Sequence, residues 1–168
     1  AETGVGLEGR FRAWHVHPEY GLLWEVDLPN GTTTQGANSL LELAFRGGVG
    51  IPTWRIGVIA EAGFTGVSTS DTYASHAGWS EFLGAYTKRP LWSANPAQGG
   101  RIDSAGVVRM PVFAAGTVRG VFLCDRLPPG DTDPSGRLYA TAVAAAGLAV
   151  VSGGTIYVTY TLRSRPVS

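Results

Sequence analysis

The sequence has 168 residues, of which 44% are hydrophobic and 15% are charged. This balance excludes a disordered chain and predicts one folded domain, residues 1–168, with enough apolar material to bury a core. Thirteen basic residues balance thirteen acidic ones. Proteins that bind nucleic acid through its phosphates usually carry a basic excess, so nucleic acid is not expected as the main partner.

Cys124 is the only cysteine, which excludes an intramolecular disulfide and a zinc site built on cysteines. The longest apolar run, residues 138–151, is interrupted by Thr141 and Gly147 and is too short to span a membrane. Residues 1–6 lack the basic start and the apolar centre of a signal peptide. We therefore expect no membrane association.

Glycine and proline, with 24 and 10 residues, are scattered between short runs of β-forming residues, a pattern typical of an all-β fold. Residues 7–17 alternate apolar and polar side chains, Pro18 ends the run, and residues 20–28 read as the returning strand. These runs predict an N-terminal hairpin, about residues 5–28, which is also a candidate for an extended arm.

One helix is expected, over residues 38–46. Asn38 or Ser39 can cap its start, and Gly47 follows its end. Leucine, alanine and phenylalanine recur at helical spacing and predict a buried stripe, formed by Leu40, Leu41, Ala44 and Phe45.

The remaining expected elements follow in chain order: a central strand over 53–60, a loop over 61–79, short strands over 81–86 and 88–92, a hairpin of 107–114 with 117–124, a surface loop over 127–136, and strands over 138–145 and 155–162. The resulting eight to ten strands and one short helix predict an antiparallel β-sandwich with jelly-roll-like connections.

The densest cluster of polar and aromatic residues is the segment 71–81, with the sequence DTYASHAGWSE. It contains acid, serine and histidine, but Ser75 and His76 are adjacent and would point to opposite faces of an extended chain. A hydrolytic triad needs a hydrogen-bonded serine–histidine pair, and the G-x-S-x-G turn is missing. We therefore interpret the segment as a structured loop held by Asp71, His76, Trp79 and Glu81.

Two further groups of residues allow more than one interpretation. His15 and His17 have strand spacing that could serve a metal, but a site needs additional ligands, so exposed or interfacial histidines are favoured. The five tryptophans could pack in the core, lie at a protein interface or stack on sugars. Trp14 and Trp24 share the N-terminal hairpin and are candidates for a contact surface.

The order of several segments resembles a family of small virion structural proteins of tailed bacteriophages, which are carried beside the major capsid protein. The resemblance spans about residues 7–162. Its most specific part is the 71–81 block, and the matching segments around it are 35–38, 53–59, 86–92, 117–123 and 153–162. Tyr73 stands where the family commonly has a smaller or thioether side chain, and residues 163–168 run past the shared strand.

The resemblance implies a capsid decoration (cement) protein, assembled in the host cytoplasm and located on the outer surface of the virion capsid. It supplies no catalytic residue, cofactor or metal. The implied partners are the major capsid protein and further copies of the chain, as a dimer or trimer. Candidate contact residues are Trp14 and Trp24 in the hairpin and Arg163 and Arg165 near the C-terminus.

Two alternatives stay open. The first is a tail or fibre component that contacts the host and binds glycans through exposed tryptophans. The second is a glycan hydrolase, which would need two facing carboxylates, for which Asp71 and Glu81 are the pair to inspect.

Overall fold

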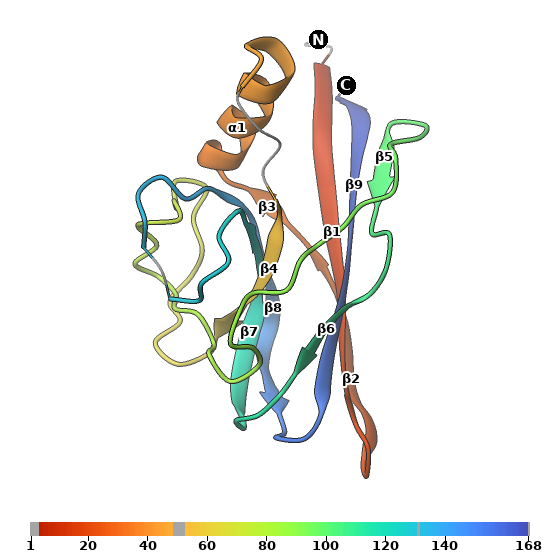
Figure 1. The fold of residues 1–168 in the computed structure, drawn as a ribbon, viewed down its shortest axis with the longest axis vertical. Coiled ribbons are helices and arrows are strands. Elements are labelled where there is room, and N and C mark those ends of the chain that lie inside the picture. Colours follow the sequence, from red (N-terminus) through yellow and green to blue (C-terminus); the bar gives the residue numbers. More distant parts are fainter. Residues whose placement is uncertain (1–3, 49–52, 131, 168) are drawn as a thin grey trace.

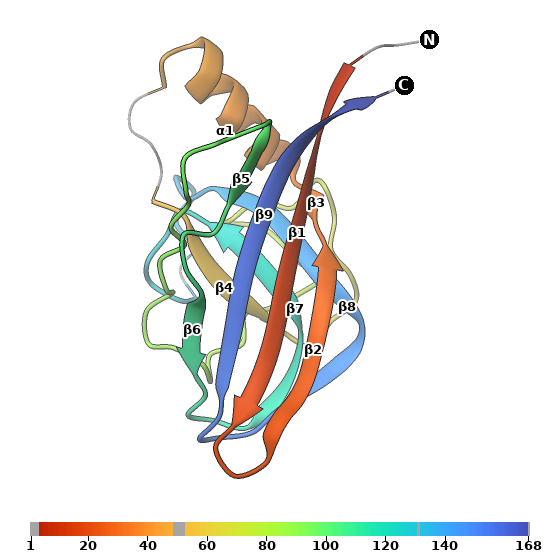
Figure 2. The ribbon, with the colours of Figure 1, turned by 90° about the vertical axis from the view of Figure 1, so that its right-hand side faces the viewer.

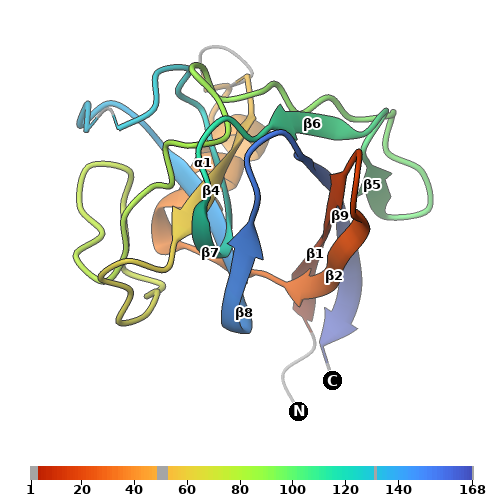
Figure 3. The ribbon, with the colours of Figure 1, turned by 90° about the horizontal axis from the view of Figure 1, so that it is seen from below.

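The computed structural model describes residues 4–48, 53–130 and 132–167, with the backbone only for residues 4, 5, 166 and 167. The elements are β1 (Gly4–His17), β2 (Gly21–Pro29), β3 (Gly31–Thr32), α1 (Thr34–Phe45), β4 (Arg55–Ala60), β5 (Arg101–Asp103), β6 (Val108–Pro111), β7 (Gly116–Cys124), β8 (Leu138–Val150) and β9 (Thr155–Val167). The strands form two antiparallel sheets that face each other (Figures 1 and 3). The expected all-β sandwich with one helix is confirmed.

Sheet A has the strand order β2-β1-β9-β5, and β6 pairs with β9 beside β5. Sheet B has the order β3-β8-β7-β4. The described residues therefore form nine strands, where a regular jelly roll has eight. None of their helices has the length and apolar character needed to cross a membrane.

The long strands β1 and β9 pair at the centre of sheet A (Figure 2). It is in register from Gly4 opposite Val167 to Val16 opposite Thr155. The N-terminal hairpin belongs to this sheet along its length, because β1 also pairs with β2. It is therefore an integral part of the sandwich rather than a separate arm.

The core lies between the sheets and follows from the alternation in the strands. Phe11 of β1 and Tyr160 of β9 are fully buried and stack with ring centroids 4.3 Å apart. From sheet B, Ile56 and Val121 pack into the same cluster. A smaller cluster around Phe122 lies on the opposite side of sheet B, beneath the loops.

The helix begins four residues earlier than the sequence predicts. Its cap is Thr33, whose Oγ1 accepts a hydrogen bond from the Gly36 backbone N–H at 2.9 Å. Ser39 lies inside the helix and donates to the carbonyl of Gln35. The predicted apolar stripe is right only for Leu40, which is partly buried against the core, because the fully buried residues of the helix are Gly36 and Ser39. The other three members of that stripe, Leu41, Ala44 and Phe45, are exposed.

Three strand expectations are corrected by the pairing. The segments 107–114 and 117–124 do not form a hairpin, since β6 pairs with β9 in sheet A and β7 lies in sheet B. Strand β4 is at the edge of sheet B, not at its centre. The segments 81–86 and 88–92 make only isolated bridges to β4, at Glu81 and Leu91, and cover that edge as loops.

Candidate functional site

The segment 71–81 is held together by its own side chains. The Asp71 carboxylate accepts hydrogen bonds from the Trp79 indole Nε1–H at 3.0 Å and from the Ser68 backbone N–H at 2.9 Å. The His76 ring stacks on Trp79 with centroids 3.8 Å apart, and its Nδ1 lies 3.0 Å from the Trp79 carbonyl oxygen. These contacts order the loop, which supports the interpretation of the block as structural.

Glu81 forms a buried ion pair with Arg89, whose side chains are 7% and 2% exposed. Both guanidinium contacts, from Nε and Nη2, are 2.7 Å long, and together they make a bidentate pair. The carboxylate also accepts from the Tyr86 hydroxyl at 2.7 Å and from the Gly130 N–H at 2.6 Å. Four donors therefore meet on this one carboxylate.

The Arg89 guanidinium is bound on its other side as well. Its Nη1 donates to the Tyr73 hydroxyl at 2.7 Å and to the Arg126 carbonyl at 3.1 Å, and its plane lies near the rings of Tyr73 and Phe122. Through Arg89 and Glu81 the loop 71–92 is fastened to the loop that follows β7. A hollow of about 280 Å³ beside this pair is lined by Trp79, Phe122 and the same polar groups.

Burial shapes the titration of this region. Burial acts to lower the pKa of Arg89, but the hydrogen bonds and charge of Glu81 outweigh it and leave that pKa raised. Burial and the neighbouring Glu81 charge raise the pKa of Tyr86 well above its usual value. Burial raises the pKa of the Cys124 thiol to about 11. At neutral pH this places a charged pair among uncharged hydroxyl and thiol groups.

The two histidines of β1 are buried, which corrects the expectation of exposed or interfacial strand histidines. His15 Nε2 accepts from the Val151 backbone N–H at 3.0 Å, so its Nδ1 carries the proton that faces the Thr155 carbonyl at 3.0 Å. His17 accepts at Nδ1 from the Glu19 N–H. Through His15 and through the contact of His17 Nε2 with the Ser152 carbonyl at 3.3 Å, β1 is bound to the turn between β8 and β9. The described part of the chain holds no group of three or more potential metal ligands.

The outer face of sheet A carries the charged side chains of alternate strand positions. Its residues are Glu25 and Asp27 of β2, Glu8, Arg10, Arg12 and Trp14 of β1, Tyr157, Thr159, Thr161, Arg163 and Arg165 of β9, Arg101 and Asp103 of β5, and Arg109 of β6. Six arginines and four acidic residues therefore share this face. We call it the arginine face.

One row of the arginine face is aromatic. Trp14 and Tyr157 are directly opposite in the β1–β9 register, and their rings stack with centroids 5.5 Å apart. The guanidinium of Arg12 lies 5.6 Å from the Trp14 ring centroid, and that of Arg109 lies 5.8 Å from the Tyr157 ring centroid. Two arginines thus flank a stacked aromatic pair across three strands.

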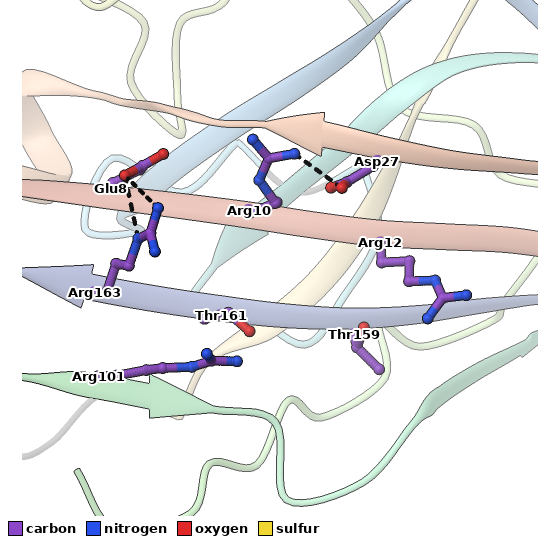
Figure 4. A pocket seen from close by; sticks show the side chains of 8 residues that line it. All are labelled: Glu8, Arg10, Arg12, Asp27, Arg101, Thr159, Thr161 and Arg163. Carbon is purple, nitrogen blue, oxygen red and sulfur yellow. Dashed lines mark hydrogen bonds and ion pairs between the residues drawn. The ribbon is translucent and has the colours of Figure 1, made fainter. Parts of the chain in front are cut away.

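Beside this row the face is hollowed, with a volume of about 380 Å³ (Figure 4). Thr159 and Thr161 are short and form the floor, and Arg10, Arg12, Arg101 and Arg163 stand around them. Arg10 pairs with Asp27 at 2.9 Å, and Arg163 pairs with Glu8 at 3.1 Å. These ion pairs are at least partly exposed to solvent. Exposed pairs of this kind contribute about 0 to 1 kcal/mol each.

The structure separates the four predicted contact residues. Trp14, Arg163 and Arg165 lie on the arginine face, where Glu8 contacts both arginines. Trp24 faces the opposite side of the sheet and donates its Nε1–H to the Ala149 carbonyl at 2.8 Å, so it connects the two sheets. Sequence reasoning missed Arg101 and Arg109 because β5 and β6 join this face only through their pairing with β9.

The helix α1 and the turn between β1 and β2 lie at opposite ends of the long axis (Figure 1), and large apolar side chains are exposed at each. At one end, Leu41 and Phe45 are one turn apart on α1, and Phe45 is 81% exposed. At the other end, Tyr20 in the turn between β1 and β2 is exposed, as are Leu22 and Leu23 at the start of β2. Large apolar groups exposed together mark contact surfaces more often than single ones do.

No protein-family model matches the chain, and a search of curated proteins finds no similar sequence.

Proposed function

We propose that the protein is a capsid decoration protein of a tailed bacteriophage, which binds the outer surface of the head and stabilises its lattice. The observation that carries the proposal is the pair of apolar ends. A protein that bridges neighbouring subunits needs at least two separate contact surfaces, and Leu41 with Phe45 and Tyr20 with Leu22 lie at opposite ends of one rigid sandwich. The resemblance of the 71–81 block to virion proteins supports the same role.

The bonding of the 71–81 block fits a structural protein better than a hydrolase. Asp71 is held by Trp79, and Glu81 is neutralised by Arg89. A glycan hydrolase needs one carboxyl that gives up a proton and one that attacks or activates water. A carboxylate locked in a bidentate pair with a buried arginine is poorly suited to either task.

The tail-fibre alternative depends on exposed tryptophans for sugar stacking. Trp79 and Trp92 are buried, and Trp14, Trp24 and Trp54 are partly buried. No described tryptophan is therefore freely exposed for sugar stacking, and we retain the capsid role. Its partners are the major capsid protein and further copies of the chain, and repeated weak contacts over many copies give the shell its added strength.

The test is a cryo-electron-microscopy map of the intact particle. We expect symmetric copies on the head, with the α1 end and the β1–β2 turn against different neighbours. Heads assembled without the chain should rupture at lower temperature than complete heads. Density at the tail alone would refute the proposal.

A double substitution in α1 tests whether the apolar end of the sandwich contacts the head. Leu41→Ser with Phe45→Ser should leave the melting temperature of the isolated protein unchanged, because both side chains are exposed. The same variant should lower the rupture temperature of heads that carry it. Heads as stable as those with the original chain would contradict a bridging role for this end.

A further inference from the structure

The arginine face is a charged surface with a fixed pattern, and its composition suggests what it binds. Arginine, tryptophan and tyrosine are the residues that contribute most at protein–protein interfaces. Trp14 and Tyr157 supply a rigid aromatic row, and the hollow beside it presents guanidinium groups over two threonines.

We propose that the arginine face is the docking surface for an acidic patch of the protein partner. The partner would place carboxylates in the hollow, where the guanidinium groups of Arg10, Arg12, Arg101 and Arg163 outnumber the carboxylates of Glu8 and Asp27. It would place an apolar group over Trp14 and Tyr157. This inference rests on the proposed function, which makes that partner the major capsid protein.

The ion pairs already on the face do not block this use. All four arginines of the hollow are already paired, with Asp27, Glu25, Asp103 and Glu8, but their side chains are 50 to 62% exposed, so these pairs are solvent-screened and exchange at small cost. A partner carboxylate that enters the hollow can meet two guanidinium groups at once. Arginine suits this because its planar donors bind carboxylates in a bidentate manner.

The acidic residues on the face narrow the choice of partner. Glu8, Glu25, Asp27 and Asp103 interrupt the arginines, so a uniform polyanion such as a nucleic acid would meet like charges in several rows. A protein surface can match a mosaic of both signs, and such matching sets the register of docking. A second copy of the same face is a poorer match than an acidic surface, because six arginines against four acidic residues leave each face with a net positive charge.

The experiment measures binding of the purified chain to heads assembled without it, by co-sedimentation. Arg10→Glu and Arg163→Glu should each weaken binding at least about tenfold, because each places a like charge before the partner carboxylates. Lys88→Glu is the matched control, since it makes the same charge reversal on an exposed loop residue away from the face. Trp14→Ala should also weaken binding, with less dependence on salt.

Thermal unfolding of each variant separates a docking defect from misfolding. The altered arginines are half exposed, so melting temperatures close to that of the original chain are expected. A neutral variant, Arg10→Gln, provides a second test that does not add a repulsive charge, and it should weaken binding less than Arg10→Glu.

The outcomes distinguish the two proposals. Selective loss of binding in the arginine variants supports the docking surface. Equal binding of all variants to the heads refutes this docking surface and leaves the decoration role intact. No binding of the original chain to the heads refutes the decoration role and this docking surface together.

Discussion

Substitution of Glu81 by glutamine should strongly destabilise the fold. Glutamine keeps the shape of the side chain but removes the charge, and it leaves the Arg89 guanidinium, 2% exposed, without its counter-ion. Breaking a buried ion pair in this way costs about 3 to 5 kcal/mol. A domain of ordinary stability has about 5 to 15 kcal/mol in total, so this single change removes a large part of it. At about 2 to 4 °C per kcal/mol for a chain of this length, the melting temperature should fall by about 6 to 20 °C.

The assay is urea and thermal unfolding of the purified protein, followed by circular dichroism. Glu42→Gln is the matched control, because Glu42 forms an exposed helical pair with Arg46 and should lose less than about 0.5 kcal/mol. The double variant Glu81→Leu/Arg89→Met removes both charges and should be more stable than Glu81→Gln. If Glu81→Gln lost no more than its control, the buried pair would not hold the loops as we describe.

Three further substitutions test other contacts, each by urea unfolding. Gly36→Ala should lower the free energy of unfolding by about 1 to 3 kcal/mol, because the new Cβ would lie 2.3 Å from the Tyr139 carbonyl oxygen; this clash outweighs the preference of alanine for helices. Gly31→Ala is the control: its Cβ would meet nothing within 4 Å, so the free energy of unfolding should change little. Trp24→Phe should cost about 1 kcal/mol through the lost hydrogen bond to β8, and full stability would contradict that contact. Burial raises the pKa of Cys124 from 9.0 to about 11, so the folded state holds the thiol proton more tightly and its contribution is complete below pH 9. That contribution should fall by about 1.4 kcal/mol per pH unit between pH 9 and 11, and an equally steep fall in Cys124→Ala would rule out the thiol as its source.

The sequence predicted best the strands whose burial alternates. Residues 7–17 and 155–162 show a period of two, and both lie within the paired strands β1 and β9. Local pattern could not show which sheet a strand joins. The segments before and after Gly116 look like one hairpin, but the first completes sheet A and the second crosses to sheet B.

The helix shows a different limit of sequence reasoning. Hydrophobic spacing predicted burial of Leu41 and Phe45, but close contact with the Tyr139 backbone decides which side of the helix faces the sheet. Only a glycine allows that approach, and Gly36 supplies it. A small residue that determines packing gives no hydrophobic signal.

The candidate sites were also predicted only where the signal is local in sequence. Local spacing predicted that Asp71, His76 and Trp79 would order one loop. It could not predict that Glu81 is neutralised by Arg89, since a pairing between two loop residues has no periodicity. The arginine face was recognised only in part, because Arg101 and Arg109 reach it through β9 and not through nearby sequence.

The position of β9 has a consequence for folding. This strand pairs with β1, β5 and β6, so until β9 is made β5 and β6 have no partner strand in sheet A and β1 pairs only with β2. Its contacts with β1 span most of the chain, and contacts between residues far apart in sequence slow folding. On the ribosome, β1 and β2 must wait as an isolated hairpin with their apolar face uncovered. We therefore expect the chain to reach its native state only after β9 has been synthesised. Until then, chaperones would be needed to cover the apolar face of the hairpin.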